Sequence, residues 1–283
     1  MSVRTMVKKL GRLEALARRQ TDRNNAVLQA LAEDPVRILT HAGLEPDDWQ
    51  AGVLRSDAQR MLLLASRQAG KSSVAAALAL QTALLCPRSP VLLLSPSLRQ
   101  SGELYRKVVD LFGALGRPMG VSAESALRLE LANGSRVVSL PGDEKNIRGF
   151  SGVALLIIDE AARIEDALYC SVRPMLAVSQ GRLVALSTPF GKRGWFHDEW
   201  HGAGDWQRVK ITAEQCPRIS PQFLSEERRA LGERWYRQEY LCGFEDTVDA
   251  VFAWADIQAA LSDEVRPLPF DQADPAAPGG ELP

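Results

Sequence analysis

The chain has 283 residues, of which 46% are hydrophobic, and its formal net charge at pH 7 is -1. This length suits one large α/β domain, or such a domain with a small satellite. The near-neutral charge excludes a chain that is basic throughout, so any contact with nucleic acid has to be local. The four cysteines form no C-x-x-C pair, so their spacing indicates neither a zinc knuckle nor a disulfide framework.

The apolar runs of the sequence are all short. None approaches the roughly 18 residues of a membrane span. The basic N-terminus is not followed by the apolar core of a signal peptide. We therefore expect a soluble, cytoplasmic protein with no membrane partner.

The N-terminal segment, residues 1–48, is basic and helical in pattern. Its first 25 residues carry seven Lys or Arg and two Asp or Glu. Apolar side chains recur there at helical spacing, at Leu10, Leu13, Leu16 and Ala17. Such an amphipathic basic helix is either a solvated helix face or a contact for nucleic acid or a partner, and the pattern leaves both interpretations open.

Residues 49–194 alternate between short apolar runs and helical or turn-rich stretches. The runs are MLLLA (61–65), VLLLS (91–95), RVVSL (136–140), VALLIID (153–159) and LVALS (183–187). Continuous apolar strands of this length are typical of a mostly parallel sheet buried between helices. The pair Asn133-Gly134 between two alternating segments adds a hairpin. The predicted fold class is therefore a doubly wound α/β sheet with an antiparallel excursion.

The C-terminal third changes in composition. Residues 195–252 are rich in tryptophan and charge, and we expect them to form a small satellite subdomain with a helix over 225–240, begun by Ser225. Residues 253–283 are rich in proline and acidic side chains, which predicts a linker or disordered tail.

The segment SRQAGKSS (66–73) follows an apolar strand and opens an alanine-rich helix. Backbone N–H groups at a helix start cradle phosphate oxygens, while Lys71 neutralises them and Ser72 offers its hydroxyl to Mg²⁺. Ala65 stands where the usual motif has its first glycine. The loop alone is therefore a modest indication of a nucleotide site.

A second apolar strand ends in Asp159-Glu160, about 90 residues after the lysine. An aspartate there holds Mg²⁺, and the glutamate orients and activates the attacking water as general base. A third strand ends in Ser187-Thr188, whose hydroxyls would lie at the same sheet edge and sense the γ-phosphate. The three strand ends together predict an ATP hydrolase that uses Mg²⁺.

These elements, taken in order, resemble the ATPase domain of the large terminase subunit of tailed double-stranded DNA bacteriophages. The resemblance runs from about Trp49 to Phe252. It is carried by WQ (49–50), SRQAGKSS, LLLSPSLRQSGELY (92–105), NIRGFSG (146–152), LLIIDEAARI (155–164), STPFGKRGWFHDEW (187–200) and WYRQEYLCGFEDTVDAVF (235–252). It implies a P-loop NTPase fold of the RecA-like, ASCE class with a small lid subdomain.

The resemblance also assigns expected roles to residues. It makes Ala65 a family variant and brings Arg67 to the γ-phosphate, where it senses or relays phosphate loss. Gln50 matches the position that reads the adenine edge, and Arg148 matches a trans arginine finger. Ser187 and Thr188 match the coupling motif. The loop residues expected to bind nucleotide are Ser66, Arg67, Gln68, Ala69, Gly70, Lys71, Ser72 and Ser73.

The family resemblance implies a motor that couples ATP hydrolysis to translocation of duplex DNA into a procapsid. Its implied partners are double-stranded DNA, a portal protein, a small terminase subunit and further copies of the chain in a ring, at the procapsid portal in the host cytoplasm. The RNase H-like nuclease of full-length relatives is not expected in these residues. The alternatives are a helicase-like DNA-dependent ATPase and a nucleotide-binding assembly protein with little turnover.

His197 and His201 stand four residues apart, as in zinc-binding helices. The glutamate that should directly follow the first histidine is replaced by Asp198, and no third ligand is evident. We therefore expect a solvated helix face rather than a metal site.

Overall fold

The structure is a computed structural model of the whole chain, and it describes residues 3–142, 147, 149–246 and 260. Residues Met1–Glu245 form one compact unit. The second unit, Asp246–Pro283, has two described residues, so the predicted tail at 253–283 falls almost entirely outside the described part of the chain.

An eight-stranded sheet forms the centre of the first unit, with the order β3-β4-β5-β2-β6-β7-β1-β8. The strands are β1 (Arg60–Ala65), β2 (Pro90–Ser95), β3 (Val121–Ser125), β4 (Arg128–Leu131), β5 (Arg136–Pro141), β6 (Leu155–Asp159), β7 (Arg182–Ser187) and β8 (Gln207–Ile211). Along this order, the neighbours β5-β2, β2-β6, β6-β7, β7-β1 and β1-β8 pair in parallel. The pairs β3-β4 and β4-β5 are antiparallel. The five predicted runs and the predicted hairpin are all present, which confirms the mostly parallel sheet.

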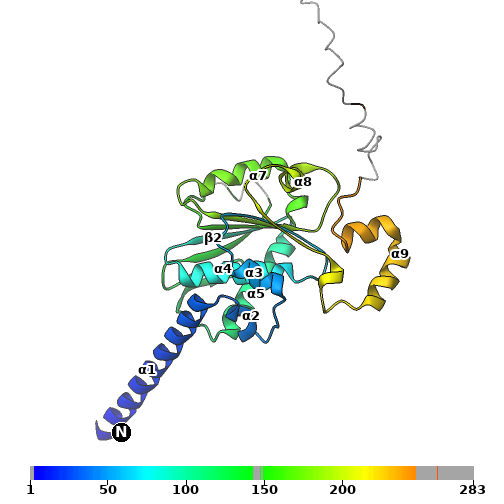
Figure 1. Cartoon of the computed structure of the whole chain (residues 1–283). Coiled ribbons are helices and arrows are strands. Elements are labelled where there is room, and N and C mark those ends of the chain that lie inside the picture. The colour runs from blue at the N-terminus through cyan, green and yellow to red at the C-terminus, as the bar shows by residue number, and fades with distance from the viewer. Residues whose placement is uncertain (1–2, 143–146, 148, 247–259, 261–283) are drawn as a thin grey trace, which may run out of the picture. The chain divides into compact units, whose positions relative to one another are not determined.

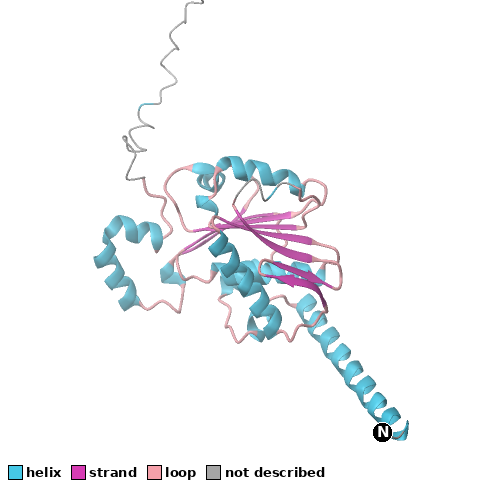
Figure 2. Cartoon of the chain, turned by 180° about the vertical axis from the view of Figure 1, so that it is seen from behind, coloured by secondary structure: helices cyan, strands magenta, loops and turns pink. Residues whose placement is uncertain are grey.

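Helices cover both faces of this sheet (Figures 1 and 2). They are α1 (Val3–Glu33), α2 (Arg37–His41), α3 (Asp48–Arg55), α4 (Lys71–Leu85), α5 (Leu98–Ala114), α7 (Asp166–Val172), α8 (Gly194–His201) and α9 (Pro221–Glu239), with short 3-10 turns η1 (Ala161–Arg163), η2 (Arg173–Leu176) and η3 (Ala213–Gln215). Among the described residues, none of these helices has the length and apolar character to cross a membrane.

Neighbouring residues of each strand serve opposite layers, because side chains alternate along a strand. Leu63 and Ile157 pack with α4, α5 and the end of α1, whereas Leu64 and Ile158 pack with α7 and α8. Helix α4 is buried on most of its surface, and its alanine-rich sequence lets it lie close to the strands. The functional strand ends are therefore anchored in two hydrophobic layers.

Within residues 195–252, which were expected to form a small satellite subdomain, the described residues belong to two parts of the structure. Strand β8 pairs with β1 in the main sheet, and Trp195 of α8 stacks on Tyr169 of α7 with ring centroids 3.8 Å apart. Helix α9 and η3 form their own small cluster. Its buried members are Ala213, Leu224, Tyr236 and Tyr240.

The predicted start of the last helix at Ser225 was wrong. Helix α9 begins one turn earlier, because the Ser220 hydroxyl accepts a hydrogen bond from the Phe223 amide at 3.2 Å and Pro221 takes the first helical position. At Gly232 (φ 75°) the helix bends, a conformation that favours glycine.

Candidate active site

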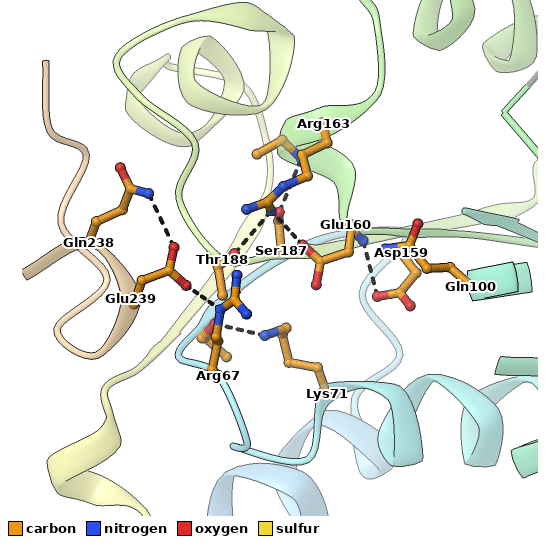
Figure 3. Close-up of polar contacts among 12 residues, drawn as sticks. Arg67, Lys71, Gln100, Asp159, Glu160, Arg163, Ser187, Thr188, Gln238 and Glu239 are labelled. Carbon is orange, nitrogen blue, oxygen red and sulfur yellow. Dashed lines mark hydrogen bonds and ion pairs between the residues drawn. The ribbon is translucent and has the colours of Figure 1, made fainter. Parts of the chain in front are cut away.

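The carboxyl ends of β1, β6 and β7 lie at one edge of the sheet because these strands are parallel neighbours. The predicted residues Lys71, Asp159 and Ser187 come at or directly after those ends, and they gather in one region with side chains from the end of α9 (Figure 3). The fold thus brings Lys71 and Ser187 together across 116 positions, and Arg67 and Glu239 across 172.

The loop between β1 and α4 is tightly turned. Gly70 adopts φ 94° immediately before α4, and a Cβ atom added there would lie 2.6 Å from the Gln50 Nε2 atom. Gln68 also has a positive φ of 60°. The Ser66 amide donates to the Ile211 carbonyl at 2.9 Å, which ties the loop to β8. Ser72 and Ser73 are half-buried in the first turn of α4.

Lys71 is buried beneath this loop. Its ammonium donates to the carbonyl oxygens of Ala65 and Ser66, each at 3.0 Å. Burial lowers the pKa of Lys71, while the nearby charges of Glu160 and Asp159 oppose the shift. An ammonium has three N–H donors, so two are engaged by the loop and one is left for a further acceptor.

Asp159 ends β6 and is 7% exposed. Burial raises the pKa of its carboxyl to about 6, the charge of Glu160 adds to the rise, and Lys71 opposes it. Its Oδ1 accepts a hydrogen bond from the Glu160 amide at 3.0 Å. A carboxylate this desolvated is suited to bind a cation, since a bound cation compensates for the lost hydration of the carboxylate.

Glu160 is held by an arginine that the sequence analysis did not assign. One guanidinium nitrogen of Arg163 donates to Glu160 Oε2 at 2.7 Å and to the Thr188 hydroxyl at 3.1 Å. The Ser187 hydroxyl accepts from the Ala162 amide at 3.2 Å. These bonds join the turn after β6 to the end of β7. The i,i+3 spacing of Glu160 and Arg163 is the sequence signal that could have indicated the pair.

The Arg163 guanidinium also lies over the Phe190 ring, 4.7 Å from its centroid. Arg193 lies 4.8 Å from the centroid of the same ring. The segment after β7 is therefore packed onto the residue that holds Glu160.

Arg67 points to α9. Its Nε atom donates to Glu239 Oε2, and its backbone amide donates to the Glu239 carbonyl at 3.2 Å. This hydrogen bond raises the pKa of Arg67. The Arg67 side chain is 62% exposed, whereas that of Glu239 is 9% exposed. No motif in the sequence assigns a role to Glu239, and no local pattern marks a partner that distant in the chain.

The predicted adenine-reading residue lies against the same loop. Gln50 is buried, and its Oε1 accepts from the Asp47 amide at 2.9 Å as part of a capping box that starts α3. Arg218 binds both Asp47 carboxylate oxygens at 2.7 Å and the Ala69 carbonyl at 3.2 Å. The D-x-x-Q pattern at 47–50 was the overlooked sequence signal for this cap.

Two further predictions have different outcomes. Arg148 lies outside the described residues. The histidine pair is only partly a solvated helix face: His201 is exposed, whereas His197 is only 13% exposed, and both imidazole rings pack edge-on against Phe244. The described residues contain no cluster of three or more His, Cys, Asp or Glu arranged to hold a metal ion.

Comparisons with known proteins give one family match and several relatives. Residues 62–259 match the family model described as "Terminase large subunit, T4likevirus-type, N-terminal". The large terminase subunit of Escherichia phage T5 is 26% identical over 219 residues, which cover 73% of this chain and 50% of that protein. The chain spans about half the length of the curated relatives that it matches.

Solved structures match the fold. The large terminase ATPase domain of Thermus phage P74-26 gives a TM-score of 0.64 at 23% identity, covering 74% of this chain and 96% of that one. The large terminase of a thermophilic bacteriophage, in complex with ATP-gamma-S, gives 0.56 at 17% identity, covering 70% and 52%. These likenesses confirm the predicted P-loop NTPase fold.

Proposed function

The chain belongs to the family of T4-like large terminase subunits, and from this premise we propose that it is the ATPase of a viral DNA-packaging motor. In this proposal it hydrolyses ATP and couples the hydrolysis to movement of double-stranded DNA into a procapsid. The observation that carries the proposal is the meeting of Lys71, Asp159 and Glu160 at the carboxyl ends of β1 and β6.

The loop and the start of α4 supply the phosphate-binding half of the site. The helix start presents backbone N–H groups and the positive end of its dipole. Lys71, buried and already held by two loop carbonyls, presents its remaining donor with little loss of side-chain entropy. We infer that Ser66, Gln68, Ala69 and the rest of this loop bind ATP phosphates.

Ser72 and Asp159 fit Mg²⁺. A hydroxyl and a carboxylate are the hard oxygen ligands that this cation prefers, and the desolvation of Asp159 favours a cation beside it. Bound Mg²⁺ would supply charge neutralisation of the β- and γ-phosphates. The described residues otherwise act by placing phosphate, water and proton acceptor.

Glu160 is the proposed general base. Its hydrogen bond with Arg163 fixes the direction of the carboxylate, and the bond from Arg163 to Thr188 fixes the arginine in turn. Arg163 is a positioning residue in this scheme. Through Thr188 and Ser187, the end of β7 is linked to the residue that handles the attacking water, which suits a coupling role for this strand end.

Arg67 connects the phosphate loop with α9. The guanidinium that pairs with Glu239 is exposed and long enough to exchange this carboxylate for another anion, and a γ-phosphate is such an anion. We infer that ATP competes with Glu239 for Arg67. Binding and loss of the γ-phosphate would then be reported to α9.

The assembly belongs to the proposal as well. A ring of copies with a portal protein and a small terminase subunit, at the procapsid in the host cytoplasm, is the expected setting. Arg148 as a trans finger stays a prediction. If a neighbour completes the site, the specific ATPase activity rises with protein concentration and Arg148→Ala removes that rise.

The test of the ATPase is turnover and nucleotide binding by the purified chain in three variants. Glu160→Gln should lower turnover by about 10²–10⁴ while ATP still binds, since only the proton acceptor is lost. Lys71→Ala should remove both binding and turnover. Glu103→Gln breaks the exposed ion pair between Glu103 and Arg106 on α5 and is the matched control. It should change neither ATP binding nor turnover. Turnover in Glu160→Gln and Lys71→Ala equal to the parent chain would refute the proposal.

A further inference from the structure

Helix α1 has a long stretch that the rest of the domain does not cover. All residues from Arg12 to Arg23 are exposed, which is more than three turns with no face against the domain. Leu31, in contrast, is fully buried, and Arg55 binds both carboxylate oxygens of Asp34 at 3.0 and 2.9 Å. The C-terminal end of α1 is therefore fixed in the core, while the preceding turns are free of it (Figures 1 and 2).

Positive charge is concentrated on this arm. Residues 1–25 carry seven Lys or Arg against two Asp or Glu, whereas the whole chain has a net charge of -1, so the rest of the chain is acidic. A chain that separates its charge in this way presents a local attraction for polyanions and little attraction elsewhere.

Three arginines form one stripe. At 3.6 residues per turn, Arg12, Arg19 and Arg23 lie within about 40° of one another around α1 and span about 16 Å along it. Glu14 falls on the opposite face. Within the described residues, none of the three arginines has a hydrogen bond or an ion pair, unlike Arg106, which pairs with Glu103. Uncompensated guanidiniums in a row are suited to successive phosphates of a nucleic-acid backbone.

The apolar side of α1 is less suited to a protein partner. Leu13 and Leu16 are about half exposed, but the seam that would continue toward the buried Leu31 is interrupted by Gln20 and Asn24. These two polar side chains bond each other at 2.9 Å instead of offering apolar surface. A helix–helix seam of sufficient length for stable association is therefore not present in the exposed turns.

We propose that α1 is a binding arm for the backbone of double-stranded DNA, with Arg12, Arg19 and Arg23 as its phosphate contacts. The proposal rests on the proposed function only for the identity of the polyanion. Contacts of this kind are independent of base sequence and strongly weakened by salt. Phosphates would also relieve the mutual repulsion of the arginines, so DNA should stabilise a helical segment that is marginal by itself.

The test measures binding of the full chain to a fluorescent 30-base-pair duplex of arbitrary sequence from about 50 to 200 mM salt. A variant with Arg12→Gln, Arg19→Gln and Arg23→Gln should bind about tenfold or more weakly at the lowest salt. The slope of log K against log salt should become shallower by about 2.7, at about 0.9 for each lost contact.

The matched control carries Arg106→Gln, Arg117→Gln and Arg128→Gln. It has the same change in charge, but each of these arginines pairs with a glutamate, so both affinity and slope should stay near those of the parent chain. ATP turnover without DNA should be unchanged in both variants, which reports folding and tests the proposed function separately from the arm.

Two outcomes would overturn the proposal. The first is equal loss of DNA binding in both triple variants, which would mean that only net charge matters. The second is unchanged DNA binding in the α1 arginine variant. A separate variant, Leu13→Ser with Leu16→Ser, then shows whether the helix serves another purpose, because it would abolish self-association of the chain if α1 joined two copies.

Discussion

Two sides of the candidate site are built in contrasting ways. Lys71, Asp159 and Glu160 follow strands that are buried between two helical layers, whereas Glu239 ends a bent helix whose own core has four buried members. The first side has fixed positions. The second reaches the site at Arg67, whose exposed guanidinium and backbone amide both donate to Glu239. A site with one rigid and one loosely held side is suited to reporting a bound phosphate as movement of the looser side.

The largest expected effect comes from breaking the rigid side. Ile157→Ala in β6 removes a fully buried side chain and should lower the free energy of unfolding by about 2–5 kcal/mol. Leu231→Ala on α9, where the side chain is 41% exposed, should change it by less than about 0.5 kcal/mol. Urea denaturation of both variants measures the difference. Similar losses would contradict the contrast between the two sides.

Arg163 tests positioning on the rigid side. Arg163→Ala should lower kcat by about 10–100-fold with a small change in KM, because Glu160 loses its orientation but ATP keeps its loop contacts. Arg163→Lys should recover part of kcat, since an ammonium keeps the charge. Arg193→Ala is the control, because it removes the other guanidinium that packs on Phe190 but no contact of Glu160. It should leave kcat unchanged. A loss confined to KM would assign Arg163 to nucleotide binding instead.

Glu239 tests the looser side. If ATP competes with Glu239 for Arg67, Glu239→Gln should tighten ATP binding by about 2–10-fold and speed hydrogen exchange in α9. Glu245→Gln removes another carboxylate paired with an arginine near the end of α9 and should leave ATP affinity unchanged. Weaker ATP binding in Glu239→Gln would show that the carboxylate assists the nucleotide rather than competing with it.

The smallest effect concerns the bend in α9. The hydrogen bond from Arg228 lowers the pKa of Glu233 from its ordinary value of 4.5, and the pair spans Gly232. A lowered carboxyl pKa contributes stability that is complete above 4.5 and is lost as pH falls through the folded value. Glu233→Gln should therefore slightly speed hydrogen exchange in α9 at pH 7, relative to the parent chain, and this difference should shrink as pH falls below 4.5.

The control for this pair is Glu226→Gln, on the same helix but before the bend. It should produce no difference that depends on pH. A difference in Glu233→Gln that stays the same size as pH falls below 4.5 would assign the effect to helix propensity rather than to the ion pair.

The sequence by itself determined the five apolar strands, the hairpin, the phosphate loop and the strand-end residues, but not the edge strands β3 and β8. Apolar runs identify parallel strands, and parallel strands place their carboxyl ends at one edge, so Lys71, Asp159 and Ser187 could be assigned to one site before any contact was known. The start of α9 was misplaced, because Ser220 and Pro221 competed with Ser225 as a helix start and gave the better cap.

The tertiary structure decided which side chains hold these residues. Arg67 and Glu239 are 172 positions apart, Asp47 and Arg218 are 171 apart, and Arg163 reaches Thr188 across 25. Local periodicity reports which face of an element is buried, but it carries no information about the partner of a polar side chain across the fold. The exposure of Arg12 to Arg23 likewise depended on how far α1 extends beyond its buried end, which helical spacing alone does not give.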